Sequence, residues 1–99
     1  MIHLQVKHLR TFRERAIGLI GTNKPSPVFF QTRFGIHTFG MTYAIDVVIL
    51  NQDNEVIKVV EALKPNRIFL WSPLFNKVLE LPTGSIKTHS IKKGTKVAF

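Results

Sequence analysis

The apolar run from Ile45 to Leu50, which only Asp46 interrupts, constrains the fold more than any other feature of the sequence. A run of this length is typical of a β-strand and is far short of the roughly 20 residues that a membrane-spanning helix needs. A polar turn, 51–54, follows it, and residues 56–62 are rich in β-branched side chains. Two such runs around a short polar turn predict a β-hairpin.

Further short strands and turns alternate along the rest of the chain. Polar residues separate Ile2, Leu4 and Val6, which predicts a half-buried strand at the start. Strands are also expected over residues 28–31, 37–41, 67–71, 77–81 and 95–99. Because turn signals recur about every 8–12 residues, we expect a mainly β, β-rich α+β fold, as a small β-sandwich or barrel.

One short helix is expected near the N-terminus, over residues 12–20. Thr11 and Glu14 have the spacing of a capping box, in which each side chain accepts a hydrogen bond from a free backbone N–H at the helix start. Gly21 supplies the expected end of this helix. Residues 85–89 are expected to form one additional helical turn.

The length and the composition limit the classes of protein. The chain has 99 residues, 44% of them apolar, which fits one globular domain spanning 1–99. It has no cysteine, which excludes disulfides, thiolate metal sites and cysteine nucleophiles. The first residues lack a charged segment followed by an apolar one, so we expect no signal peptide and a cytoplasmic protein.

The positive charge is concentrated towards both ends of the chain. The formal net charge is +8, and residues 83–99 contain four lysines and no acid. These lysines are Lys87, Lys92, Lys93 and Lys96. If the two ends meet in the fold, they form one positive face that attracts anions such as nucleic acid. The alternative is a solvated face that only keeps a small domain soluble.

A series of short motifs also resembles a known family. The segments are ERAxGL at 14–19, HTFGM at 37–41, IDVV at 45–48, VLELPxG at 78–84 and IxxG at 91–94. Their order and spacing resemble the uncharacterised bacterial and archaeal family called domain of unknown function 192, over about residues 8–99. The resemblance implies a small β-sandwich or barrel with a short helix, and no assigned activity or cofactor.

This chain departs from the family pattern at two places, neither of which removes a polar group. Ala44 stands where the family usually has proline, and Thr83-Gly84-Ser85 stands where Ala-Gly-Thr is usual.

Asp46 is the first candidate for a functional residue, because a carboxylate inside a central strand must be desolvated. A buried charge needs a partner, which Arg13, Arg15 or the backbone N–H groups of a turn could supply. A structural ion pair or turn-closing hydrogen bond is one interpretation. A general base or metal ligand is the other.

The HTFGM segment is the second candidate. As a strand it would place His37, Phe39 and Met41 on one face. Imidazole is the side chain that most commonly exchanges protons or binds metals near neutral pH. Our leading hypothesis is a non-enzymatic binding module with a shallow pocket for a small anionic molecule or a partner's peptide. The candidate ligand-binding residues are His37, Phe39, Met41 and Asp46, with Arg13 and Arg15 near the rim.

Two alternatives remain. The basic ends, with Lys87, Lys92, Lys93 and Lys96, could bind nucleic acid, although no RNP-type signature is present. A small hydrolase or metal-dependent enzyme using His37 and Asp46 is less favoured, because we find no nucleophile elbow and no paired-histidine spacing. The scattered glycines form no phosphate-binding loop. We therefore expect no catalytic residue, no metal and no cofactor.

Overall fold

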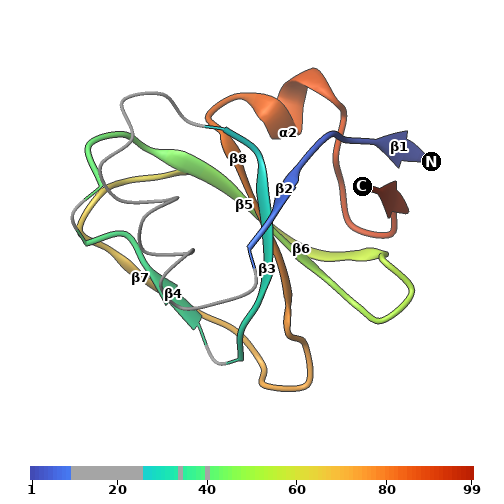
Figure 1. Ribbon diagram of the computed structural model, residues 1–99, viewed down its shortest axis with the longest axis horizontal. Coiled ribbons are helices and arrows are strands. Elements are labelled where there is room, and N and C mark those ends of the chain that lie inside the picture. The colour runs from blue at the N-terminus through green and yellow to red at the C-terminus, as the bar shows by residue number, and fades with distance from the viewer. Residues whose placement is uncertain (10–25, 34, 40) are drawn as a thin grey trace.

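The computed structural model describes residues 1–9, 26–33, 35–39 and 41–99. The described part of the chain is β-rich and contains one short helix (Figure 1). Its elements are β1 (Ile2–His3), β2 (Lys7–His8), β3 (Val28–Gln31), β4 (Gly35–His37), β5 (Ile45–Leu50), β6 (Val56–Leu63), β7 (Ile68–Leu70), β8 (Lys77–Pro82), α2 (Ser85–Thr88) and β9 (Val97–Ala98).

A five-stranded sheet with the order β2-β3-β8-β5-β6 forms the centre of the molecule. Its neighbours are antiparallel except for the parallel pair of β2 and β3. β5 lies between β8 and β6, and all six of its residues are buried. This position explains the apolar run in the sequence, because a strand covered on both faces carries apolar side chains on both.

The two faces of this sheet belong to two separate cores. β5 contributes Val47 and Ile49 to one core, and Val48 and Leu50 to the other, since successive side chains of a strand point to opposite faces. We call the side with Val47 the ribbon face and the side with Val48 the helix face. Each face is covered by elements that come from distant parts of the chain.

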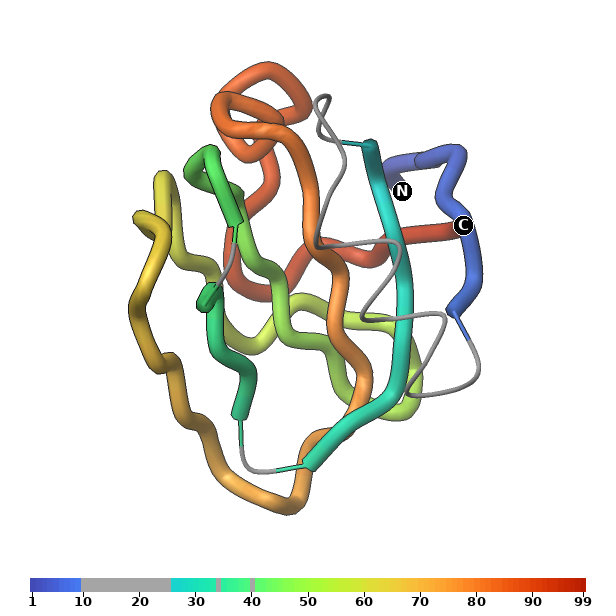
Figure 2. Tube along the Cα trace, turned by 60° about the vertical axis from the view of Figure 1, so that its left-hand side comes forward, coloured from blue at the N-terminus to red at the C-terminus, as the bar shows by residue number. Residues whose placement is uncertain are grey.

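Two small sheets and the helix cover these faces. Paired strands β4 and β7 pack Ile36 and Phe69 against the ribbon-face core. Helix α2 and the parallel pair of β1 and β9 add Ile86 and Val97 to the helix-face core. Figure 2 shows the β4–β7 pair on the left of the molecule and both chain ends on the right.

Most of the predicted strands are confirmed. The 45–62 hairpin is present as β5 and β6, and 28–31 forms β3 as expected. Alternating burial continues through residues 1–7, although the hydrogen bonding divides this segment into β1 and β2. The predicted helical turn near residue 85 is α2.

The predicted strand over 37–41 is wrong. β4 ends at His37, and the chain turns at 38–39. Thr38 hydrogen-bonds to the turn that joins β6 to β7, and the N–H of Met41 donates back to the Thr38 carbonyl at 3.2 Å. These bonds replace a strand ladder, so the alternation of the HTFGM motif does not reflect a β-strand.

The sheet does not close into a barrel within the described residues, because its end strands β2 and β6 do not pair with each other. The expected helix over 12–20 lies outside the described residues. No helix in the part of the chain that the structure describes has the length and apolarity needed to cross a membrane.

Candidate functional site

Asp46 joins three segments on the helix face. It is fully buried on β5, and its Oδ1 accepts a hydrogen bond from the N–H of Ala62 at 2.9 Å. Its Oδ2 accepts from the N–H groups of Gly84 at 3.1 Å and Ile86 at 2.9 Å. Of the partners expected from the sequence, backbone N–H groups are those observed, while Arg13 and Arg15 lie outside the described residues.

The backbone around Asp46 is shaped to present these donors. The β5–β6 register shifts between Ile45 and Val47, which places two residues of β6 opposite Asp46. Ala62 lies in this bulge at a φ of 53°, a conformation that non-glycine residues adopt uncommonly. Gly84, at a φ of 94°, precedes α2 and turns its N–H towards the carboxylate. Asp46 is fully buried, and both of its carboxylate oxygens accept hydrogen bonds. Its role in this structure is therefore to hold β5, the end of β6 and the start of α2 together.

Thr38 has a similar role on β4's side of the molecule. Its hydroxyl is buried, donates to the Lys64 carbonyl at 2.7 Å and accepts from the Arg67 N–H at 2.9 Å. Its own N–H donates to the Arg67 carbonyl at 2.9 Å, and its carbonyl accepts from the Asn66 N–H at 3.1 Å. Thr38 therefore fixes the turn that leads into β7.

His37 and Phe39, on either side of Thr38, are exposed. Their rings are stacked with centroids 5.0 Å apart and an angle of 25° between the planes. The Phe39 N–H donates to His37 Nδ1 at 3.3 Å, so a neutral His37 carries its proton on Nε2. The stack holds the imidazole in one orientation at the surface.

Two aliphatic side chains of β7 extend this surface. Ile68 and Leu70 are 62% and 65% exposed, while Phe69 between them packs towards the core. In the β4–β7 register Ile68 is opposite His37, and Leu70 is opposite Gly35. We call the exposed set of His37, Phe39, Ile68 and Leu70 the apolar ribbon.

Gly35 is needed because Leu70 lies across it. A Cβ at Gly35 would be 2.5 Å from Leu70 Cδ2 and 2.5 Å from the Phe69 carbonyl oxygen. The Leu70 side chain therefore packs directly against the backbone of Gly35. A glycine in a short strand is a sequence signal for such close approach.

The predicted pocket residues are not brought together as a group. His37 and Phe39 are neighbours at the surface, whereas Met41 is buried in the ribbon-face core. Asp46 lies under the opposite face, against α2. No cluster of three or more metal-binding side chains occurs among the described residues.

The C-terminal lysines are all exposed, and the backbone of Lys96 lies beside the N-terminal strand. Their chain segment ends in β9, which pairs in parallel with β1. The N–H of Ile2 donates to the Lys96 carbonyl at 3.0 Å, and that of Leu4 to the Ala98 carbonyl at 2.8 Å. The two ends of the described chain therefore pair, while Arg10, Arg13, Arg15 and Lys24 of the basic N-terminal part lie outside the described residues.

Comparison with known proteins establishes the family of this chain. The sequence model of the family DUF192, described as Uncharacterized ACR, matches residues 2–99. The chain belongs to the DUF192 family. A UPF0127 protein of Pyrococcus abyssi is 34% identical to this DUF192 chain over 94 residues, which are 89% of this chain and 80% of that protein. A UPF0127 protein of Pyrococcus furiosus is 30% identical over 105 residues, 99% and 89% of the two chains.

The same fold occurs in a solved protein of unknown function from Novosphingobium aromaticivorans. Its TM-score against this DUF192 chain is 0.77 at 19% identity, and the match covers 90% of this chain and 70% of the other. At this identity the likeness concerns the fold alone.

Sequence reasoning missed three residues of this DUF192 chain that matter for its surfaces and core. The sequence predicts only a strand for Ile68 and Leu70, because apolar residues on both faces also occur in fully buried strands such as β5. Glu80 is a second buried acid, 2% exposed on β8 and in register with Val28 and Val47. Its position between two leucines of the LELP motif was the available signal.

Proposed function

We propose that this DUF192 protein is a non-enzymatic binding module whose apolar ribbon holds an acidic, partly apolar segment of a partner protein. The observation that carries the proposal is the joint exposure of Ile68 and Leu70 beside the stacked His37 and Phe39. Exposed apolar side chains that gather on one surface are typical of interaction sites, whereas scattered ones need no explanation.

The ribbon is also held rigid before any partner arrives. The hydrogen bonds of Thr38 fix the turn into β7, and the Phe39 N–H orients the His37 ring. The absence of a side chain at Gly35 leaves room for Leu70 to pack against the backbone. A surface that is already ordered loses less conformational entropy on binding, so more of the contact energy becomes affinity. A cluster of aromatic and aliphatic side chains can form the central anchor of an interface once a partner covers it.

The surrounding charge selects an acidic partner. Residues 26–39 and 62–76, which contain both ribbon strands, include no acid. They include Arg33, Lys64 and Arg67, all of them exposed. Lys58 of β6 also reaches over the ring of Phe69, with Nζ 5.2 Å from the centroid. Complementary charge at the rim of an interface speeds association and sets specificity.

The test begins with a phage-displayed random peptide library selected on the wild-type protein. We expect the enriched peptides to contain Asp or Glu beside apolar residues. One enriched peptide is then labelled with fluorescein, and its Kd is measured by fluorescence anisotropy. The double variant Ile68→Ser/Leu70→Ser should raise the Kd about tenfold or more, since anchors of this kind each contribute over about 1 kcal/mol.

Leu74→Ser provides the matched control. Leu74 is even more exposed, at 83%, but lies in the loop after β7 and outside the ribbon. The proposal predicts wild-type affinity for this variant. Absence of any enriched peptide, or equal binding by the double variant and the wild type, would overturn it.

A further inference from the structure

We propose a second binding surface, separate from the apolar ribbon, on which the joined chain ends bind single-stranded nucleic acid. We call it the terminal face and define it by residues 1–6, His8, Phe29 and residues 87–99. The sequence contains no acidic residue in 1–9 or in 83–99. Pairing of β1 with β9 brings these two acid-free, lysine-containing segments together.

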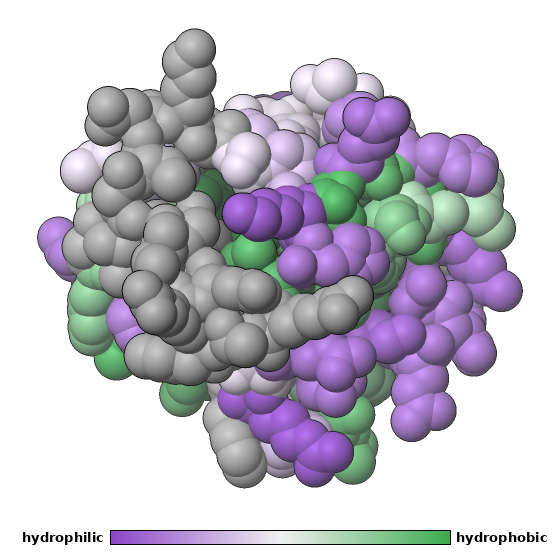
Figure 3. Space-filling model, in the orientation of Figure 1, coloured by the Kyte–Doolittle hydropathy of each residue, from purple (hydrophilic) through white to green (hydrophobic). Residues whose placement is uncertain are grey.

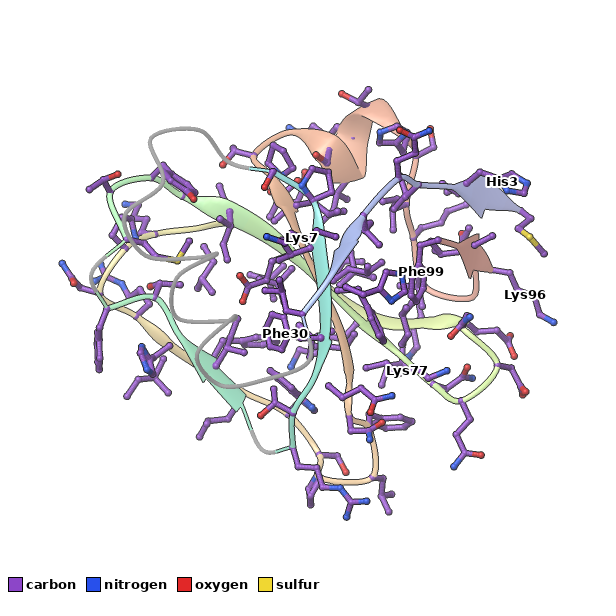
Figure 4. All side chains as sticks on the ribbon, viewed as in Figure 1. His3, Lys7, Phe30, Lys77, Lys96 and Phe99 are labelled. Carbon is purple, nitrogen blue, oxygen red and sulfur yellow. The ribbon has the colours of Figure 1, made fainter. Side chains whose placement is uncertain are left out.

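The N-terminal strand directs its polar side chains away from the protein. Ile2, Leu4 and Val6 pack against the helix-face core, while His3 and Gln5 between them are exposed. Lys7 is exposed too, but it is in register with Val28 of the ribbon-face core, so its side chain lies on the other side of the sheet. In Figure 4 the side chains of His3 and Lys96 lie at the right-hand end of the molecule, and Phe99 lies between them and the central strands. Figure 3 shows hydrophilic side chains covering much of this right-hand side, around a smaller apolar area.

The C-terminal segment, whose Ile91 and Val97 are buried in the helix-face core, contains further lysines. Lys87 lies on α2, and Lys92 and Lys93 lie in the turn before β9, all of them exposed. Lys96, which is also exposed, forms an isolated antiparallel backbone bridge with Glu55. We assign the phosphate contacts to Lys92 and Lys93, because they are adjacent in the chain and both exposed.

An aromatic cluster distinguishes the terminal face from a merely basic surface. The ring of His8 lies 5.2 Å from that of Phe29 and 5.7 Å from that of Phe99, and the two phenylalanine rings are 4.5 Å apart. Phe29 and Phe99 are half-buried against the helix-face core, whereas His8 is exposed. His8 thus presents a ring to solvent on a rigid support.

Basic side chains around an exposed ring fit single strands better than duplexes. Unpaired bases can stack on aromatic side chains without sequence preference, and lysines follow the phosphate backbone. Duplex bases are already stacked on each other and offer no free face to His8. The partner assigned to the terminal face is therefore single-stranded RNA or DNA.

The test measures the anisotropy of fluorescein-labelled oligo(U) and oligo(dT) of about 12 nucleotides, within the usual site size of small binding domains. Titrations run from about 50 to about 200 mM salt, because each phosphate contact with a single strand adds about 0.7 to the log–log salt slope. Lys92→Ala/Lys93→Ala should lower this slope by about 1.4. Lys64→Ala/Arg67→Ala also removes two positive charges, but from the β6–β7 turn on the other side of the molecule, and should change neither slope nor affinity (Figure 1).

The stacking contribution is tested at His8. His8→Ala should weaken binding about fivefold or more, and His8→Phe should restore it, since a phenyl ring also stacks. A melting curve of each variant shows whether the fold is kept. The proposal is overturned if neither oligonucleotide binds at about 50 mM salt, or if His8→Ala binds as the wild type does. It is also overturned if heparin and duplex DNA bind with the same affinity and slope as oligo(U), because that shows attraction to polyanions in general.

Discussion

We call Asp46 and its three donors, the N–H groups of Ala62, Gly84 and Ile86, the junction. The junction and the apolar ribbon depart in opposite ways from the usual pattern of buried apolar and exposed charged residues. At the junction a charged side chain is buried, and three backbone N–H groups surround it. On the ribbon, aliphatic side chains are exposed, and basic residues surround them. A buried polar group with all its bonds made stabilises the fold, whereas an exposed apolar group contributes little until something covers it.

The largest expected effect is on stability and comes from Asp46. Asp46→Asn replaces one acceptor oxygen with an NH₂ group, which then faces backbone N–H donors in a buried site. We expect the free energy of unfolding to fall by about 3–5 kcal/mol, measured by urea denaturation. Asp53→Asn, on the exposed β5–β6 turn, is the control and should be close to neutral. A loss below about 1 kcal/mol for Asp46→Asn would contradict the assigned role of the junction.

Thr38→Val should have the second-largest effect. Valine has nearly the same shape but cannot bond to the Lys64 carbonyl or to the Arg67 N–H, which are then left without the hydroxyl. We expect a loss of about 2 kcal/mol in unfolding free energy. Thr38→Ser keeps the hydroxyl and should retain most of the stability. Equal losses in the two variants would show that the methyl group, and not the hydroxyl, holds this turn.

Gly35→Ala should have a smaller effect, confined to the ribbon. The new Cβ can displace the flexible end of Leu70, but the Phe69 carbonyl belongs to the backbone and must shift as well. We expect a loss of about 1–2 kcal/mol, in the range of overpacking changes. Binding of the selected peptide should weaken in parallel, because Leu70 moves. If the variant is destabilised but binds the peptide as the wild type does, the position of Leu70 over Gly35 does not matter for binding.

The smallest stability effect is expected for the ribbon itself. Ile68→Ser/Leu70→Ser removes two side chains that are mostly exposed, so the unfolding free energy should stay within about 0.5 kcal/mol per substitution. Peptide affinity should nevertheless fall strongly. A stability loss comparable to that of Thr38→Val would mean that these side chains support the fold.

The sequence predicts the parts of this fold that depend on neighbouring residues. The 45–62 hairpin and the α2 turn follow from apolar runs and turn residues within a few positions of each other. The burial of Asp46, and its need for partners, also followed from the strand that contains it. The identity of its donors did not, because Ala62, Gly84 and Ile86 are 16 to 40 residues away in the chain.

The error at HTFGM has the same cause. Alternation over 37–41 favours a strand, but Thr38 finds partners 26 and 29 residues away, and these bonds turn the chain. Met41 then points into the core while His37 and Phe39 remain outside. Exposure of Ile68 and Leu70 likewise depends on β4 and β7 forming a pair outside the main sheet, which no local pattern specifies.

Hydrogen–deuterium exchange, measured with and without the selected peptide, tests the division between junction and ribbon most directly. The account predicts that the peptide slows amide exchange in residues 35–39 and 67–70. It also predicts no change at Gly84 and Ile86, whose N–H groups are already bonded to Asp46. Slower exchange at Gly84 and Ile86 with no change in β4 and β7 would contradict it, because the binding surface would then lie at the junction.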